Sequence, residues 1–382
     1  MWSDRQPVKL EIANPRSISY RAGRALIRTS DAEVVVEGHA FDIFEAFYNS
    51  CPEGRLQGFL AYDLAAELED IGPLPPDTSE FPQLYFRWEP RATARGWSSD
   101  EINVNERGAS SVTTNLERSQ FEAAVARIVA TIHAGDIFQT NLCRCIEAPC
   151  EPGTEWDLYQ RLRTINPARY ENFLRIDDHR TLFSISPELF LKVDNRVVTS
   201  EPIKGTRPRG ATPAEDEALI RELLASVKDR AELAMIVDVV RNDLSRVCEV
   251  GSVKVTEHAQ LMTLPTVHHS YSTVQGHLRT DAGPIDLLRA AFPAASISGA
   301  PKIEAMRVAM REEGCRRGPC MGAIGWLDTN GDMEFSVAIR TAFTENGIVR
   351  YYAGCGITAD SIPSDEFDES GHKAAAFLRA LS

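Results

Sequence analysis

A lysine in a crowded basic turn is the first residue that could do chemistry. Lys204 lies in EPIKGTRPRG, with Gly205 directly after it and Arg207 and Arg209 within five positions. Neighbouring positive charges and burial both favour the neutral amine, so the pKa of Lys204 is expected to fall below its usual ~10.4. A neutral lysine can act as a nucleophile, whereas a charged lysine would hold a substrate carboxylate. The local residues leave both interpretations open.

Three glutamates could together hold a hard cation. Glu232 falls on the apolar stripe of a predicted helix, where an unpaired carboxylate would be costly. Glu366 and Glu369 lie three apart, on one face of the last predicted helix. Each also has an ordinary explanation: an arginine salt bridge for Glu232, the helix dipole for the other two, and a pair with Lys373 for Glu369. Carboxylates with waters suit Mg²⁺, and no Cys/His set for zinc is present.

Two glycine-containing segments could bind an anion. SISGAPK places Ser298 and small residues at a helix start, where free N–H groups attract carboxylate or phosphate, although a plain helix cap is the alternative. AGCGI could hold Gly354 and Gly356 at positive φ and turn their N–H groups toward an anion. Cys355 lies between these glycines, and it has no identifiable base, so we do not expect a catalytic thiol.

A pair of histidines follows in TVHHSYSTVQG, a predicted strand. Alternation sends His268 and His269 to opposite faces, so one can belong to the core while the other faces a site. A single histidine is more often structural, and the pattern alone does not assign a role.

The elements that must position these residues follow from periodicity and caps. A capping box of Ser119 and Glu122 predicts a helix that ends at Gly135, and Thr212 with Pro213 predicts another helix start. Hairpin-spaced strands alternate irregularly with helices, which indicates an α+β fold with large antiparallel sheets. The further predicted elements are the strand IFQTNLCRCIEA, a long helix from Asp229, a helix opened by Pro301, the strands GAIGWLD, MEFSVAIRTAFT and IVRYYAG, and a helix over PSDEFDESGHKAAAFLRAL.

Length and composition limit the class of protein. The chain has 382 residues and a net charge of 41 − 55 = −14, which makes nucleic acid and anionic membranes poor partners. The N-terminus has no apolar signal region, and no run approaches the ~18 apolar residues of a membrane span. The eight cysteines show no CxxC pairs, so reduced thiols in a cytoplasmic protein are expected.

The polar segment 96–116 predicts a linker between an N-terminal region, 1–112, and a catalytic domain, 113–382.

Taken together, the motifs resemble the chorismate-utilising enzymes, which include anthranilate, aminodeoxychorismate, isochorismate and salicylate synthases. The similarity extends in order over residues 115–382 and is weaker before them, through GFLAYDLAAELED. The matching stretches are GDIFQTNLCR, FSISPELFLKV, EPIKGTRPRG, DRAELAMIVDVVRNDL, TVHHSYSTVQG, FPAASISGAPKIEAM, GAIGWLD, VAIRTAF, AGCGITADS and DEFDESGHKAAA.

The resemblance implies a fold and a division of labour among the candidates. The fold would be a two-lobed sandwich of large antiparallel sheets flanked by helices, with the active site between the lobes. Glu232 and Glu369 would hold Mg²⁺ with Glu366 nearby, and Glu188 would protonate the departing 4-hydroxyl of chorismate. The remaining implied site residues are the catalytic His269 and the substrate-binding Arg340, Gly354, Gly356, Gly205, Thr206 and Ser298.

Two positions indicate a branch of the family. Gln139 stands where the water-adding members carry a lysine base, which favours an ammonia-using member. PIKGT resembles aminodeoxychorismate synthases, in which the lysine is thought to attack C2 of the ring, whereas anthranilate synthases typically have PIAGT. Anthranilate synthase component I remains the alternative function, and an electrostatic contact to a substrate carboxylate remains the alternative role of Lys204. Because no glutaminase motif is present, ammonia would come from solution or from a separate glutamine amidotransferase subunit.

Four departures from the family pattern bear on this branch. Ser298 replaces a threonine, Cys355 replaces the middle glycine of AGGGI, and Cys320 stands where anthranilate synthases usually have a tyrosine. The segment 25–30, ALIRTS, only faintly resembles the segment that binds tryptophan in relatives.

Two classes of protein outside the family also remain as alternatives. One is a non-enzymatic scaffold, and the other is a nucleotide-phosphate enzyme, which the missing GxxxxGK[ST] motif disfavours.

Overall fold

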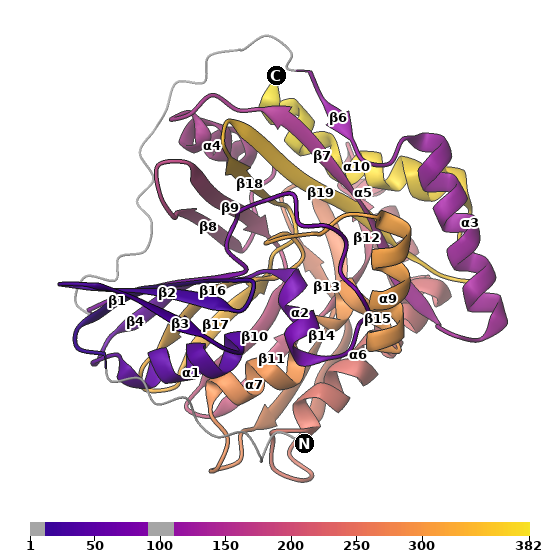
Figure 1. The fold of residues 1–382 in the computed structure, drawn as a ribbon. Coiled ribbons are helices and arrows are strands. Elements are labelled where there is room, and N and C mark those ends of the chain that lie inside the picture. Colours follow the sequence, from indigo (N-terminus) through magenta and orange to yellow (C-terminus); the bar gives the residue numbers. More distant parts are fainter. Residues whose placement is uncertain (1–11, 91–110) are drawn as a thin grey trace.

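Two antiparallel sheets pack face to face in the computed structural model, which describes residues 12–90 and 111–382 (Figure 1). The larger sheet has twelve strands and the smaller has seven. In sheet order the larger one comprises β12 (Ile203–Pro208), β14 (Val267–His277), β11 (Val197–Glu201), β10 (Leu189–Asp194), β17 (Met333–Val337), β16 (Ala323–Asp328), β4 (Arg55–Leu60), β5 (Leu84–Glu89), β1 (Pro15–Arg21), β2 (Arg24–Thr29) and β3 (Glu33–Glu37), with β13 (Lys254–Thr263) beside β14.

The smaller sheet is covered by helices on its outer face. Its strands are β15 (Gly299–Ala300), β7 (Gln139–Pro149), β19 (Ile348–Ile357), β18 (Thr341–Glu345), β9 (Arg180–Ser186) and β8 (Tyr170–Arg175), with β6 (Thr113–Thr114) beside β7. Alternate residues of β19, such as Val349 and Tyr351, pack with α4 (Glu155–Ile165) and α10 (Pro363–Leu381). The opposite face contributes Tyr352 to the core shared with the larger sheet. The predicted fold, a sandwich of large antiparallel sheets, is confirmed.

The remaining helices complete the layers. α3 packs on β7 and β19, and α6 packs on β14 of the larger sheet. The bounds are α1 (Ala40–Ser50), α2 (Ala65–Leu68), α3 (Arg118–Ala134), α5 (Pro213–Ala225), α6 (Val227–Ser245), α7 (Pro284–Ala291), α8 (Ala295–Ser298) and α9 (Lys302–Glu313), with a short 3-10 helix, η1 (Tyr62–Leu64), before α2.

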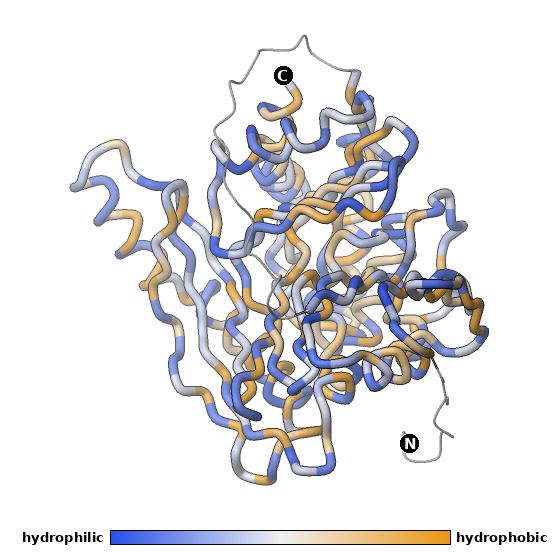
Figure 2. The backbone as a smooth tube through the Cα atoms, turned by 90° about the vertical axis from the view of Figure 1, so that its left-hand side faces the viewer, coloured by the Kyte–Doolittle hydropathy of each residue, from blue (hydrophilic) through white to orange (hydrophobic). Residues whose placement is uncertain are grey.

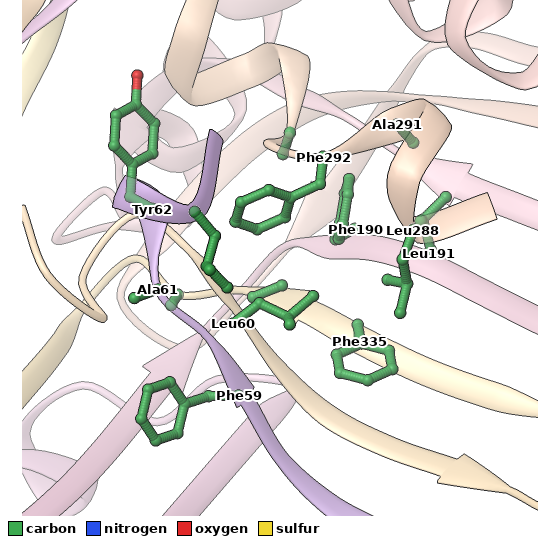
Figure 3. Close-up of a cluster of buried hydrophobic side chains, with 14 of the residues drawn as sticks. Phe59, Leu60, Ala61, Tyr62, Phe190, Leu191, Leu288, Ala291, Phe292 and Phe335 are labelled. Atoms are coloured by element: carbon green, nitrogen blue, oxygen red, sulfur yellow. The ribbon is translucent and has the colours of Figure 1, made fainter. Parts of the chain in front are cut away.

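The N-terminal strands share a sheet with the catalytic region. β4 pairs with β16 from Arg55↔Asp328 to Leu60↔Ala323, so one sheet continues across residue 112. Figure 3 shows the same continuity in the core, where Phe59 and Leu60 lie in one cluster with Phe335. The predicted linker, 96–116, falls mostly outside the described residues, and its last part includes β6.

Most predicted caps match the structure, and one does not. Thr212 caps α5 through a reciprocal pair with Glu215, and Gly135 ends α3 at φ 91°. The start of α3 is the exception. The sequence predicted a capping box of Ser119 and Glu122, but the N-cap is Glu117 and Gln120 completes the capping box.

No described helix has the length and apolar character needed to cross a membrane. Figure 2 agrees with this finding, because the hydropathy colours change repeatedly along the tube.

Candidate active site

A β-bulge at Gly205 sets the register on which the site depends. Lys204 pairs with Ser270 of β14, yet Thr206 pairs with His269, so one residue is left over between them. That residue, Gly205, has φ 81°, a conformation that glycine adopts at little cost. As a result the Thr206 hydroxyl lies 2.9 Å from Nδ1 of His269.

Lys204 extends from β12 into the space between the two sheets. Its Nζ donates a hydrogen bond to the Ser296 carbonyl at 3.1 Å, and a Cβ added at Gly356 of β19 would lie 3.4 Å from it. Burial lowers the pKa of Lys204, and the charge of Lys373 lowers it further, against the opposing effect of Glu232. The neutral amine is therefore favoured more than in a surface lysine.

The predicted role of the two neighbouring arginines in this shift is wrong. Arg207 forms ion pairs with Glu222 and Asp229, and Arg209 pairs with Asp216. Their charges are thus balanced by carboxylates on α5 and α6, and the cation that acts on Lys204 is Lys373 of α10.

Glu188 lies between β9 and β10 with only 4% of its surface exposed. Burial raises the pKa of Glu188 to about 7, although the Ser296 hydroxyl and the Lys204 charge act in the other direction. A carboxylic acid with this pKa is substantially protonated near neutral pH and can donate a proton.

Glu232 and Glu366 present carboxylate oxygens with few partners. The arginine salt bridge considered for Glu232 is not found among the described residues, where Gln139 Nε2 at 3.5 Å is its hydrogen-bond donor. Burial raises the pKa of Glu232, and the Glu366 charge adds to this effect. Glu366 is buried, with Oε1 accepting from Ser361 at 2.6 Å, and its Oε2 has no hydrogen-bond partner in the part of the chain that the structure describes.

Glu369 pairs with Lys373 at 2.7 Å, the alternative considered from the sequence. Within the described part of the chain, no three His, Cys, Asp or Glu side chains converge on one metal position. The donor set nevertheless fits Mg²⁺, because among the described residues Glu366 Oε2 has no hydrogen-bond partner and Glu232 forms no salt bridge. Mg²⁺ needs few carboxylates, since waters and substrate oxygens complete its octahedral shell.

Arg340 forms the cationic side of the site, with the His269 ring beside it. Arg340 donates to Asn166 Oδ1 and His269 Nε2, both at 3.4 Å, and has no carboxylate partner among the residues described. Burial lowers the pKa of His269 to about 3, and Arg340 contributes to this shift. The arginine can only donate, so Nε2 accepts and Nδ1 carries the proton donated to Thr206. The spare N–H groups of Arg340 can bind an anion.

The predicted alternation of the two histidines is confirmed. His268 is fully buried on the other face of β14, where Nε2 lies 2.8 Å from Asp216 and Nδ1 lies 3.0 Å from Thr263. His268 is a structural residue, and His269 faces the site.

The positive φ predicted for Gly354 and Gly356 is wrong, because both lie in the regular ladder of β19 against β7. Glycine is required there for close approach. A Cβ at Gly356 would lie 2.3 Å from Gln139 Nε2, and one at Gly354 would lie 2.1 Å from the Leu142 carbonyl. Gly356 therefore keeps space open beside Gln139, and Gly354 allows the close approach of β19 to β7.

Ser298 does not direct its hydroxyl at the site. It is fully buried in α8, where its Oγ and its N–H both donate to the Ala294 carbonyl, at 3.0 and 3.2 Å. Its hydrogen-bond donors are used within this turn, so the residue shapes the segment that carries Ser296.

The two unusual cysteines are buried donors to backbone carbonyls. Cys355 Sγ donates to Glu366 O and Cys320 Sγ donates to Thr341 O, both at 3.2 Å. Burial raises the pKa of both thiols far above its usual range, so neither is a ready nucleophile. Cys320 contacts the residue next to Arg340, which places it beside the cationic side.

The structure also brings in residues that the sequence did not identify as part of the site. Lys373 donates to the Gly354 carbonyl at 3.0 Å and acts on Lys204 electrostatically, whereas its spacing from Glu369 suggested only a helix ion pair. The Ser296 carbonyl accepts hydrogen bonds from both Asn141 and Lys204, and periodicity cannot predict these long-range bonds.

Known proteins resemble the chain in sequence and in fold. A family model described as chorismate binding enzyme matches residues 3–379. Anthranilate synthase component 1 of Streptomyces coelicolor is 43% identical over 276 residues, covering 72% of this chain and 54% of that protein. Aminodeoxychorismate synthase of Streptomyces griseus is 46% identical over 251 residues, covering 65% of this chain and 34% of that protein.

A solved structure, anthranilate synthase component I from Streptococcus pneumoniae TIGR4, superimposes with a TM-score of 0.79 at 28% identity, covering 99% of this chain and 95% of that one. The chain thus spans about half of the first of these curated relatives and a third of the second. The match to the family model covers nearly the whole chain, and the protein belongs to the chorismate-binding enzyme family.

Proposed function

We propose that this protein is an aminodeoxychorismate synthase component I, which converts chorismate and ammonia to 4-amino-4-deoxychorismate for 4-aminobenzoate and folate synthesis. The observation that carries the proposal is Lys204: an amine in the site, with its pKa lowered by burial, near a protonatable acid, Glu188. An amine that only held a carboxylate would gain from remaining charged.

In the first step the Lys204 amine attacks C2 of the chorismate ring. The C2–N bond forms, the ring double bonds shift, and the C4–O bond breaks. Glu188 gives its proton to the departing hydroxyl, which leaves as water. This proton transfer matters because hydroxide is a poor leaving group.

In the second step ammonia attacks C4 and its nitrogen bonds there. The double bonds shift back, the C2–N bond breaks, and Lys204 leaves as a neutral amine. The new ammonium group returns one proton to Glu188. The sum is chorismate and ammonia giving the amino product and water, so every participating group is regenerated.

The remaining groups bind and orient the substrate. Arg340 would hold the pyruvyl carboxylate, and His269, neutral near pH 7, would stay a hydrogen-bonding partner for Arg340 and Thr206. Glu232 and Glu369, with Glu366, would hold Mg²⁺, which when bound supplies positive charge to the ring carboxylate. Gln139 supports amination over water addition, because an amide cannot serve as the base that activates water.

Anthranilate synthase component I remains the second candidate, because relatives with that name match as well as aminodeoxychorismate synthases do. Incubation of the protein with chorismate, Mg²⁺ and ammonium salt separates the two. We expect a product that becomes 4-aminobenzoate only after a lyase is added. Anthranilate fluorescence without a lyase would contradict the proposal.

The ammonia donor in the cell would be a separate glutamine amidotransferase subunit. The curated relative from Streptomyces coelicolor is named as a component 1, which supports a two-component arrangement. Glutamine-dependent turnover should appear only when such a subunit is added, whereas ammonium-dependent turnover should need this chain alone.

A further inference from the structure

A single backbone oxygen connects the proposed nucleophile with the opposite sheet. The Ser296 carbonyl accepts from Lys204 Nζ at 3.1 Å and from Asn141 Nδ2 at 2.8 Å. A carbonyl oxygen has two lone pairs, so these two donors fill its capacity. Lys204 belongs to the larger sheet and Asn141 to β7 of the smaller one.

The segment that carries this oxygen is held on both sides. Before it, Lys302 Nζ donates to the carbonyls of Ala291 and Pro293 at 2.8 and 2.9 Å while pairing with Asp243. After it, Arg317 Nη1 donates to the Ile297 carbonyl at 3.1 Å. The Ser296 carbonyl consequently has little freedom to rotate.

Arg317 also restrains Asn141. Its Nη2 donates to the Asn141 carbonyl at 2.8 Å, and its guanidinium is 1% exposed and paired with Glu313. The same buried cation thus binds the backbone of Asn141, whose side chain is the donor, and the backbone of Ile297, which directly follows the acceptor residue Ser296. This arrangement is more rigid than an ordinary side-chain contact.

We propose that Asn141 is a positioning residue that holds the Ser296 carbonyl so that it binds one N–H of Lys204. The neutral amine has two N–H groups and one lone pair, so fixing one N–H restricts the direction of the lone pair. A fixed lone pair raises the rate of attack on a bound ring. The inference rests on the proposed nucleophile role of Lys204.

Asn141 should also disfavour the charged form of the lysine. An ammonium group has three N–H donors and no lone pair, and a carbonyl already bound by an amide is a weaker acceptor for it. The other charged groups that act on Lys204 are Glu232 of α6, Glu188 before β10, and Glu369 and Lys373 of α10. Replacement of Asn141 leaves all of them in place.

The test is Asn141→Ala, incubated with chorismate and Mg²⁺ without ammonia. Intact mass spectrometry would follow the adduct, and ammonium-dependent turnover would be measured against pH. We expect adduct formation and kcat to fall at least about tenfold, KM for chorismate to change little, and the acidic limb of the pH profile to move to higher pH. Asn141→Asp keeps the shape of the side chain but adds a negative charge, so it should move the acidic limb of the pH profile to still higher pH. This variant replaces Asn141→Ala in the test if the alanine variant does not fold.

Asn115→Ala is the matched control. Asn115 also donates to a backbone carbonyl, of Glu313 at 3.0 Å, and accepts from Cys145 N of β7 at 2.7 Å. We expect it to lower stability without moving the pH limb or the adduct rate. Equal effects of the two variants, or a wild-type adduct rate in Asn141→Ala, would overturn the inference. If the wild-type protein forms no adduct, the proposed nucleophile role of Lys204 fails and this inference fails with it, whereas the proposed function is decided separately by the identity of the product.

Discussion

Glu188 and Lys204 require opposite protonation states, and their surroundings favour those states. Burial raises the pKa of Glu188 to about 7 and lowers the pKa of Lys204. Near neutral pH the Glu188 carboxyl therefore keeps a proton that it would lose in water, and the Lys204 amine loses its proton more readily than it would in water. The two groups are close enough for each to influence the pKa of the other.

Replacement of Glu188 tests the acid. Glu188→Gln should lower kcat about 100-fold or more, because the hydroxyl then leaves without a proton. Wild-type turnover should fall on the alkaline side as pH rises through about 7, where Glu188 loses its proton. If Glu188→Gln has the wild-type kcat, Glu188 is not the general acid. The same conclusion follows if the alkaline fall in turnover is unchanged in this variant.

The same residue makes a prediction about stability. A raised folded pKa means that the contribution of Glu188 to stability is full below its unfolded pKa and is lost as pH rises through about 7. Urea unfolding should therefore show Glu188→Gln gaining ~1–3 kcal/mol relative to wild type between pH 5 and pH 8.5. If the difference in unfolding free energy between the two proteins does not change with pH, Glu188 is not a buried, neutral acid.

Removal of one carboxylate tests the proposed Mg²⁺ site. Glu232→Gln should raise the Mg²⁺ concentration needed for half-maximal turnover by ~10–100-fold, because a neutral amide is a poorer ligand. Glu257→Gln is the control, since Glu257 lies on β13 and accepts from Tyr271 and Thr273. If both variants respond to Mg²⁺ like wild type, Glu232 is not a ligand.

The bulge in β12 is the local device that brings Thr206 beside His269. Gly205→Ala places a Cβ at φ 81°, 2.9 Å from Leu223 Cδ1 and 3.0 Å from Asp229 Cβ. The left-handed conformation costs ~1–2 kcal/mol and the overpacking a further ~1–3 kcal/mol. Turnover should also fall, because relief of the clash would displace Lys204.

Gly251→Ala separates these two effects. Gly251 has φ 79°, and an added Cβ there meets nothing within 4 Å. This variant should lose only ~1–2 kcal/mol in thermal unfolding and keep full activity. Equal stability losses in the two variants would show that the contacts around Gly205 do not constrain the bulge.

Local patterns predicted the elements well but not the register between them. Thr212 and Gly135 identify helix ends because their chemistry acts within one turn. The bulge at Gly205 depends on pairing with β14, more than sixty residues later, which periodicity does not encode. The Asn141–Ser296 bond joins residues 155 positions apart, so no local pattern could have predicted it.

Family motifs supplied the candidate site residues, and the structure corrected the physical explanation of several of them. Gly354 and Gly356 were predicted to need positive φ, but they are required for close packing against β7. Arg207 and Arg209 were expected to depress the pKa of Lys204, but they are paired with acids. In each case the missing information was the neighbour across a sheet or helix interface.

Over the whole molecule, the N-terminal region completes the structure that carries the site. β4 and β5 continue the sheet from β16, and Phe59 packs in the core that also contains Phe335 (Figure 3). Removal of residues 1–112 would leave the edge of β16 unpaired and expose this core to water.

The fragment 113–382 should therefore not fold by itself. We expect it to aggregate, or to lack a cooperative thermal transition in circular dichroism, whereas the full chain unfolds cooperatively. A soluble fragment with a sharp transition and ammonium-dependent turnover would show that the region before residue 113 is dispensable.

In the proposed mechanism, Lys204 becomes covalently bonded to the substrate during turnover. The most direct measurement is intact-protein mass spectrometry after incubation with chorismate and Mg²⁺ without ammonia, followed by peptide mapping and compared with Lys204→Ala. We predict a chorismate-derived adduct on Lys204, absent from the variant and discharged as amino product when ammonium is added. Amination at the wild-type rate by Lys204→Ala, with no adduct on the wild-type protein, would contradict the account.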